Sequence, residues 1–257
     1  HGNLGKDRAS KRDRRTIKKQ ISRKIYWYSA KYLKTRGVRT LESIKYLFPY
    51  LFLGHLAGDY IFQNSYIAMR KNKDIRVLIL HIVIVFLSQL SFISGKDLTL
   101  KSFGAIVMLS IAHFFIDVGK FLCKKRFCQT WYYYLIDQSF HIATLLITAI
   151  YLGKTVQPFF NRFFVVILSV AVFNGYFLSI LVHFITSNGI YKRDYVGYLM
   201  RMVAPIFYIL NIYAFVIYAL SCLILVIIKP SKSIILNYLT TIVSTIILLE
   251  VMLWGAY

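Results

Sequence analysis

Long apolar runs separated by short polar connections occupy the chain from about residue 46 onward. The runs cover about residues 46–64, 77–94, 102–121, 133–152, 163–186, 203–228 and 234–254. A run of roughly 18 or more apolar residues is long enough to cross the hydrocarbon core of a bilayer as an α-helix. The pattern therefore predicts an all-α, polytopic helical membrane protein.

The composition agrees with this fold class, because 58% of the 257 residues are hydrophobic and only 16% are charged. A soluble domain would be about half apolar and about a quarter charged. The sequence has no P-loop, no dinucleotide-binding glycine motif, no nucleophile elbow of G-x-S-x-G type and no H-E-x-x-H. These absences argue against the enzyme classes that those motifs identify.

Positive charge is concentrated before the first apolar run, in stretches such as "KRDRRTIKKQISRK". We interpret residues 1–45 as a basic cytoplasmic arm with an interfacial amphipathic helix that contacts anionic lipid headgroups. Nucleic acid is the less favoured partner of such an arm. Residues 46–152 are then a membrane core that carries histidine and aspartate, and residues 153–257 an apolar transmembrane scaffold. The oligomeric state is not readable from the sequence.

The positive-inside rule constrains the first apolar run. If every run crosses and the N-terminus is cytoplasmic, the basic loops near residues 70–76, 124–126 and 192–201 are exported. A first run that is re-entrant or buried, with Pro49, Gly54 and Gly58, removes the conflict. About six transmembrane helices follow, with the C-terminus inside. The loop cysteines, Cys123 and Cys128, are then expected to be reduced.

Polar residues recur at a spacing of four inside three of the apolar runs. The set comprises His55, Asp59 and Gln63; His113 and Asp117; and Asp137 and His141. Residues four apart lie on one face of a helix. An ionisable residue at the bilayer centre costs about 2.5–3.5 kcal/mol on insertion scales, so it is kept where it pairs or performs chemistry. We therefore expect one intramembrane site near the cytoplasmic face.

Histidine and aspartate at this spacing favour a divalent metal ion: zinc, manganese or iron. The predicted ligands are His55, Asp59, His113, Asp117, Asp137 and His141. The predicted catalytic residues are Asp59, Asp117 and Asp137. The residues expected to orient the ligands are Gln63, His81 and Gln138. The residues expected to hold a phosphate or headgroup are Arg70, Lys71 and Lys120.

Three functions remain open at this point. The first is a metal-dependent hydrolase of a phosphate- or lipid-linked substrate. The second is a proton, ion or small-solute transporter, which would use the same polar residues. The third is a non-catalytic membrane module that recruits a partner through its basic arm, in which the polar residues only hold helices together.

The segments "GHLAGDYIFQNSYIAMRKNKD", "HFFIDVGK" and "LIDQSFHIATLL" resemble a family of uncharacterised bacterial integral membrane proteins, domain-of-unknown-function family 3307. The resemblance covers about residues 50–150 and implies a location in the bacterial cytoplasmic membrane. The family brings no established activity. It is loosely similar to membrane-bound metal-dependent hydrolases, and that likeness is an analogy.

Overall fold

The computed structural model describes residues 37–38, 40–95, 98–123, 126–186 and 195–253. The chain forms two compact units, His1–Glu42 and Ser43–Tyr257, and the second is described below. The predicted basic arm lies almost entirely outside the described residues. The first helix of the second unit runs through residues 43–56 and continues directly into a π-helix, η1 (Ala57–Ile61).

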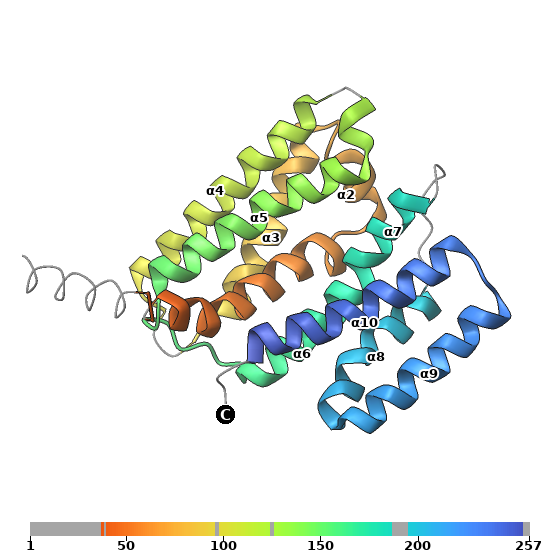
Figure 1. Cartoon of the computed structure of the whole chain (residues 1–257). Helices are drawn as coiled ribbons and strands as arrows, with labels where there is room; N and C mark the ends of the chain where they lie inside the picture. Colours follow the sequence, from red (N-terminus) through yellow and green to blue (C-terminus); the bar gives the residue numbers. More distant parts are fainter. Residues whose placement is uncertain (1–36, 39, 96–97, 124–125, 187–194, 254–257) are drawn as a thin grey trace, which may run out of the picture. The chain divides into compact units, whose positions relative to one another are not determined.

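The remaining helices complete an all-α structure, with no β-strand in the described part of the chain (Figure 1). They are α2 (Ser65–Arg70), α3 (Ile75–Ile93), α4 (Leu100–Leu122), η2 (Arg126–Gln129), α5 (Trp131–Leu152), α6 (Arg162–Val172), η3 (Phe173–Phe177), α7 (Leu178–Thr186), α8 (Tyr195–Leu210), α9 (Ile212–Ile228) and α10 (Lys232–Leu253). The prediction of an all-α polytopic protein is confirmed.

Five of these helices are long and apolar enough to cross a membrane. They are Ile75–Ile93, Leu100–Leu122, Trp131–Leu152, Arg162–Thr186 and Lys232–Leu253. The apolar run over residues 203–228, predicted as one span, is instead divided between α8 and α9. Asn211 separates them: its backbone is extended, and its side chain accepts a hydrogen bond from the Ala214 N–H at 2.7 Å. This cap starts α9 directly after the end of α8. The continuous apolar run gave no sign of the break, because the break depends on one polar side chain.

The first helix is enclosed by the bundle and runs antiparallel to α5 along its length. Ser43 lies beside Gly153, where an added Cβ would be 3.4 Å from the serine Oγ, and Tyr60 lies 2.7 Å from Tyr134, hydroxyl to hydroxyl. We call these two ends of the bundle the Gly153 end and the Tyr134 end. Of the two predicted forms, re-entrant or buried, the segment takes the buried one. It differs from a hairpin that returns to its starting face, because Ser43 and Tyr60 lie at opposite ends of α5.

Two glycines explain how this helix packs so closely. A Cβ on Gly54 would lie 2.8 Å from the Cα of Gln89, and one on Gly58 would lie 2.8 Å from the Cα of Val85. Small residues four apart let two helix backbones meet in a membrane. The glycines that suggested a hairpin therefore serve close contact with α3, and this contact brings η1 toward His81.

We expect Gly58→Ala to destabilise the protein by about 1–3 kcal/mol, because the new methyl group meets the α3 backbone. The matched change Gly104→Ala, on α4, meets nothing within 4 Å. It is expected to be neutral or to stabilise by about 0.5–1 kcal/mol, the usual gain from removing a helix glycine. Unfolding of the two variants in detergent measures the difference. Equal stability of the two variants would contradict the close packing.

Cys123, at the end of α4, and Cys128, in η2, form a disulfide. Their Cα atoms are 6.2 Å apart, within the range that a disulfide bridges. Reduced thiols were expected for a cytoplasmic loop, whereas the structure pairs the two sulfurs. The short turn through η2 brings the two cysteines together, which their position in a basic loop did not indicate.

Candidate metal centre

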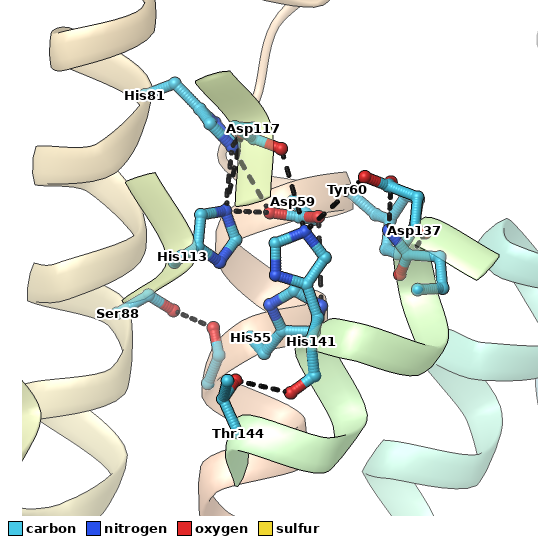
Figure 2. Close-up of polar contacts among 12 residues, drawn as sticks. His55, Asp59, Tyr60, His81, Ser88, His113, Asp117, Asp137, His141 and Thr144 are labelled. Atoms are coloured by element: carbon cyan, nitrogen blue, oxygen red, sulfur yellow. Dashed lines mark hydrogen bonds and ion pairs between the residues drawn. The ribbon is translucent and has the colours of Figure 1, made fainter. Parts of the chain in front are cut away.

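Seven ionisable side chains from four helical segments meet near the Tyr134 end of the bundle (Figure 2). They are His55 and Asp59 from the first helix and η1, His81 from α3, His113 and Asp117 from α4, and Asp137 and His141 from α5. None is more than 6% exposed. We call this group the His/Asp cluster.

Four atoms of the His/Asp cluster form a compact set, which we call the first ligand set: Asp59 Oδ1, His81 Nε2, His113 Nε2 and Asp117 Oδ2. His81 Nε2 lies 3.4 Å from Asp59 Oδ1, 3.3 Å from Asp117 Oδ2 and 3.4 Å from His113 Nε2. His113 Nε2 lies 3.7 Å from Asp59 Oδ1 and 3.6 Å from Asp117 Oδ2. Ligand atoms roughly 2.0–2.2 Å from a tetrahedral zinc ion lie roughly 3.3–3.6 Å from one another. The spacing of the first ligand set therefore fits a metal ion.

Several buried atoms of the cluster have no hydrogen-bond partner among the described residues. They include Asp59 Oδ1, Asp117 Oδ2 and both ring nitrogens of His55 and of His141. Buried carboxylates and imidazoles without a hydrogen bond are costly unless something else satisfies them. Since one ligand atom from each of these residues lies within 4.8 Å of those of its neighbours, a cation is the partner that suits them.

Three combinations of residues place their ligand atoms within 4.8 Å of one another: His55, His113 and His141; Asp59, His81 and His113; and Asp117, Asp137 and His141. The structure thus brings all six predicted ligands together. It also places His81, predicted only to orient the ligands, among the candidate ligand atoms. His81 has no histidine or aspartate four residues away on its own helix, so the spacing that identified the other six residues could not identify it.

The π-helix η1 shapes this part of the site. Its wide turn is closed by a hydrogen bond from Phe62 N to Ala57 O at 2.8 Å. Such π-helical turns are rare and often occur at functional sites. The helix ends at Ile61, so Gln63 lies outside it and is not part of a continuous helical stripe with His55 and Asp59. The predicted stripe ends at Asp59.

Two lysines contact the carboxylates of the cluster. Lys71, in the turn after α2, lies 2.9 Å from His81 Nε2 and 3.6 Å from Asp117 Oδ2. Lys120 lies 3.3 Å from Asp137 Oδ2. Burial alone would lower the pKa of Lys71, but the carboxylates of Asp117, Asp59 and Asp137 raise it above its usual value. Lys71 is therefore a cation of the site.

Arg70, the third predicted headgroup residue, turns away from the cluster. Its guanidinium lies 4.8 Å from the centre of the Tyr66 ring and donates to the Tyr66 hydroxyl at 3.4 Å. The structure thus separates Arg70 from the two lysines. A helix position next to Lys71 does not imply the same direction, because adjacent residues on a helix face different ways.

Hydrogen bonds from outside the ligand set hold Asp137. Gln138 Nε2 donates to Asp137 Oδ2 at 3.3 Å, and its amide oxygen accepts from the Tyr60 hydroxyl at 3.3 Å. The Tyr60 and Tyr134 hydroxyls are also joined. These tyrosines were not among the residues predicted from the sequence. The available signal was position: Tyr60 follows Asp59, and Tyr134 precedes Gln138 by four residues on α5.

Residues 47–170 match the family model described as "Protein of unknown function (DUF3307)". The matched region contains the whole His/Asp cluster and most of the first helix, and it ends within α6. Comparison with the curated proteins and with the solved structures found no match. The chain is thus similar, over its cluster-bearing half, to an uncharacterised family.

Proposed function

We propose that the protein is a metal-dependent membrane hydrolase that acts on a phosphate-bearing, lipid-linked substrate. The convergence of histidine nitrogens and carboxylate oxygens at metal-ligand spacing, several of them without a hydrogen-bond partner among the described residues, is the observation that carries this proposal. A divalent ion held by such a set lowers the pKa of bound water and polarises a phosphoryl oxygen. The residues that would hold it are those of the first ligand set, with His55, Asp137 and His141 beside them.

The two lysines support a phosphate-bearing substrate. Lys71 and Lys120 contact the cluster, and their side chains are 12% and 23% exposed, whereas those of the carboxylates they contact are at most 4% exposed. They therefore lie between the buried ligands and the surface of the bundle. An ammonium group there can bind a phosphate oxygen through charge-assisted hydrogen bonds.

The interior between the cluster and the Gly153 end supports a site reached from one face. Most of its buried side chains are apolar, among them Leu47, Leu51, Ile93, Ile106, Leu145 and Leu152, and the buried polar ones beside Gly54 are Ser88 and Gln89. A proton or ion path would need a continuous row of polar groups or water across this apolar interior, which two neighbouring residues do not supply. Transport is therefore the less favoured function. Recruitment of a partner through the basic arm concerns residues outside the described part of the chain.

The course of the first helix changes the proposed orientation. Residue 43 is at the Gly153 end and the cluster is near the Tyr134 end, so a cytoplasmic residue 43 places the cluster near the other face. We keep the cytoplasmic N-terminus in the plasma membrane of a bacterium, because the heaviest basic segment precedes residue 43. The Cys123–Cys128 disulfide at the Tyr134 end is compatible with an oxidising compartment on that side.

Cysteine labelling tests this arrangement. In protein whose native cysteines are replaced by serine, Ser43→Cys and Lys73→Cys are expected to react with a membrane-impermeant maleimide from opposite sides. Lys154→Cys, in the connection after α5, is the control and is expected to react from the same side as Ser43→Cys. Labelling of the Ser43 and Lys73 positions from one side would restore the re-entrant arrangement.

Elemental analysis and a hydrolysis assay test the proposed function. Purified protein in nanodiscs is expected to contain zinc, manganese or iron and to release phosphate from phosphorylated lipids, with activity lost to a chelator. His113→Ala is expected to lose both metal and activity. Asp74→Asn, at the N-cap of α3 and outside the cluster, is expected to keep both. Wild-type protein that remains metal-free after incubation with these ions would overturn the proposal.

A further inference from the structure

The two carboxylate oxygens of Asp117 face different groups of ligands. Oδ2 belongs to the first ligand set, 3.3 Å from His81 Nε2 and 3.6 Å from His113 Nε2. Oδ1 lies 3.6 Å from His141 Nε2, on α5. One side chain therefore joins two groups of donors that come from different helices.

The second group of donors is built around His141. Asp137 Oδ1 lies 4.0 Å from His141 Nε2, while its other oxygen, Oδ2, is held by Lys120 and Gln138 at 3.3 Å each. The Oδ1 atom is thus the one directed to His141. His55 lies beside both groups: its Nε2 is 3.8 Å from Asp59 Oδ2, and its ring centre is 5.0 Å from that of His141. We call Asp117 Oδ1, Asp137 Oδ1 and His141, three residues whose ligand atoms lie within 4.8 Å of one another, the second ligand set.

We infer that the His/Asp cluster holds two divalent ions, one in each ligand set, joined by the carboxylate of Asp117. This inference rests on the proposed metal-dependent function and specifies its centre. Ions bound to the two oxygens of one carboxylate fall at a separation of roughly 3.5–4 Å, which is typical of two-metal hydrolytic sites. In those sites the two ions stabilise the attacking and the leaving oxygens of an in-line displacement.

The charge of such a centre selects its substrate. Three carboxylates and two lysine ammonium groups nearly cancel in the cluster, so two divalent ions leave a clear excess of positive charge. A phosphate monoester dianion matches this excess, and its non-bridging oxygens can contact both ions. In hydrolysis a water oxygen bonds to phosphorus, the phosphorus–oxygen bond to the lipid alcohol breaks, and a water proton ends on that alcohol. The substrate class is therefore a lipid phosphate monoester.

Metal counting and electron paramagnetic resonance test the bridge. Protein stripped with a chelator and reloaded with Mn²⁺ is expected to hold two ions per chain, with a spectrum showing exchange coupling between them. His81→Ala, which weakens the first set, and His141→Ala, which weakens the second, are each expected to hold one uncoupled ion. Asp74→Asn, outside the cluster, is expected to behave as wild type.

The outcomes separate this inference from the proposed function. One ion per wild-type chain, or two ions without coupling, overturns the Asp117 bridge and leaves a metal-dependent hydrolase standing. No ion in wild-type protein overturns both. The decisive measurement uses the unmodified protein, so its result does not depend on whether a variant folds. Cleavage of phosphate diesters in preference to monoesters would overturn the assigned substrate class.

Discussion

Asp117→Asn is expected to abolish phosphate release, with a fall in turnover of at least about 10³-fold, the scale of losing a group that stabilises developing charge. Asp117 has more contacts than the other two aspartates of the cluster: its carboxylate lies within 3.6 Å of His81, His113, His141 and Lys71. Asparagine keeps the shape of the side chain, but it removes the negative charge and one of the two oxygens. A single substitution therefore removes the oxygen donor from one ligand set and leaves the other with only a neutral amide oxygen.

The expected loss of turnover differs between the aspartates, which gives a second test of the role of Asp117. Asp137 contacts one histidine, and its second oxygen is held by Lys120 and Gln138. Asp137→Asn is therefore expected to lower turnover less than Asp117→Asn, by roughly 10–100-fold, as for groups that tune a metal site. Rates with a phosphorylated lipid, and circular dichroism to confirm folding, measure both variants. A folded Asp117→Asn protein that retains more activity than Asp137→Asn would contradict the central position of Asp117.

The helical spacing of four residues accounts for the part of the site that could be predicted from the sequence. His113 with Asp117, and Asp137 with His141, lie on regular α-helices, so each pair shares a face as expected. The burial of these residues was also predictable, because an ionisable side chain exposed to hydrocarbon is energetically costly. Spacing and cost together were enough to bring six of the seven cluster residues into one predicted site.

The remaining features depend on contacts between helices, which periodicity does not report. His81 has no partner on its own helix, and its contacts come from Asp59, His113 and Asp117 on neighbouring segments. Gly54 and Gly58 are compatible with either a chain reversal or a close helix contact. Only the position of α3 shows that they serve a close contact. The division of the apolar run near residue 211 likewise depends on one side-chain cap within a run whose average hydropathy suggests a single span.

The course of the first helix also changes the side of the membrane on which the His/Asp cluster is expected, relative to the N-terminus. From the sequence, the N-terminus and the His/Asp cluster were expected on the same side, because a returning first segment reconciled the basic arm with the basic loops. In the structure, Arg162 Nε donates to Lys45 O at 3.1 Å, at the Gly153 end, whereas Lys71 contacts the cluster near the Tyr134 end. The arm and the loop charges therefore favour opposite orientations, and loop charge alone does not decide between them.

Removal of metal is expected to lower the thermal stability of the wild-type protein and to leave Asp117→Asn unchanged. An ion that binds only the folded state stabilises it by about 2.7 kcal/mol when its free concentration is 100 times its dissociation constant. For a protein of this size, that corresponds to roughly 5–10 °C in melting temperature. The direction follows from the burial of the ligands, because the carboxylates and imidazoles converge only when the first helix, α3, α4 and α5 are packed together.

Melting in detergent, with divalent ion and with chelator, measures this dependence on metal. Glu250→Gln, whose carboxylate accepts from Tyr208 and lies outside the cluster, is the control that should keep the full response to chelation. A wild-type melting temperature that is indifferent to chelator would mean that no bound ion joins these four segments. A shift of the same size in Asp117→Asn would mean that the ion binds elsewhere, because that variant lacks the carboxylate shared by both ligand sets.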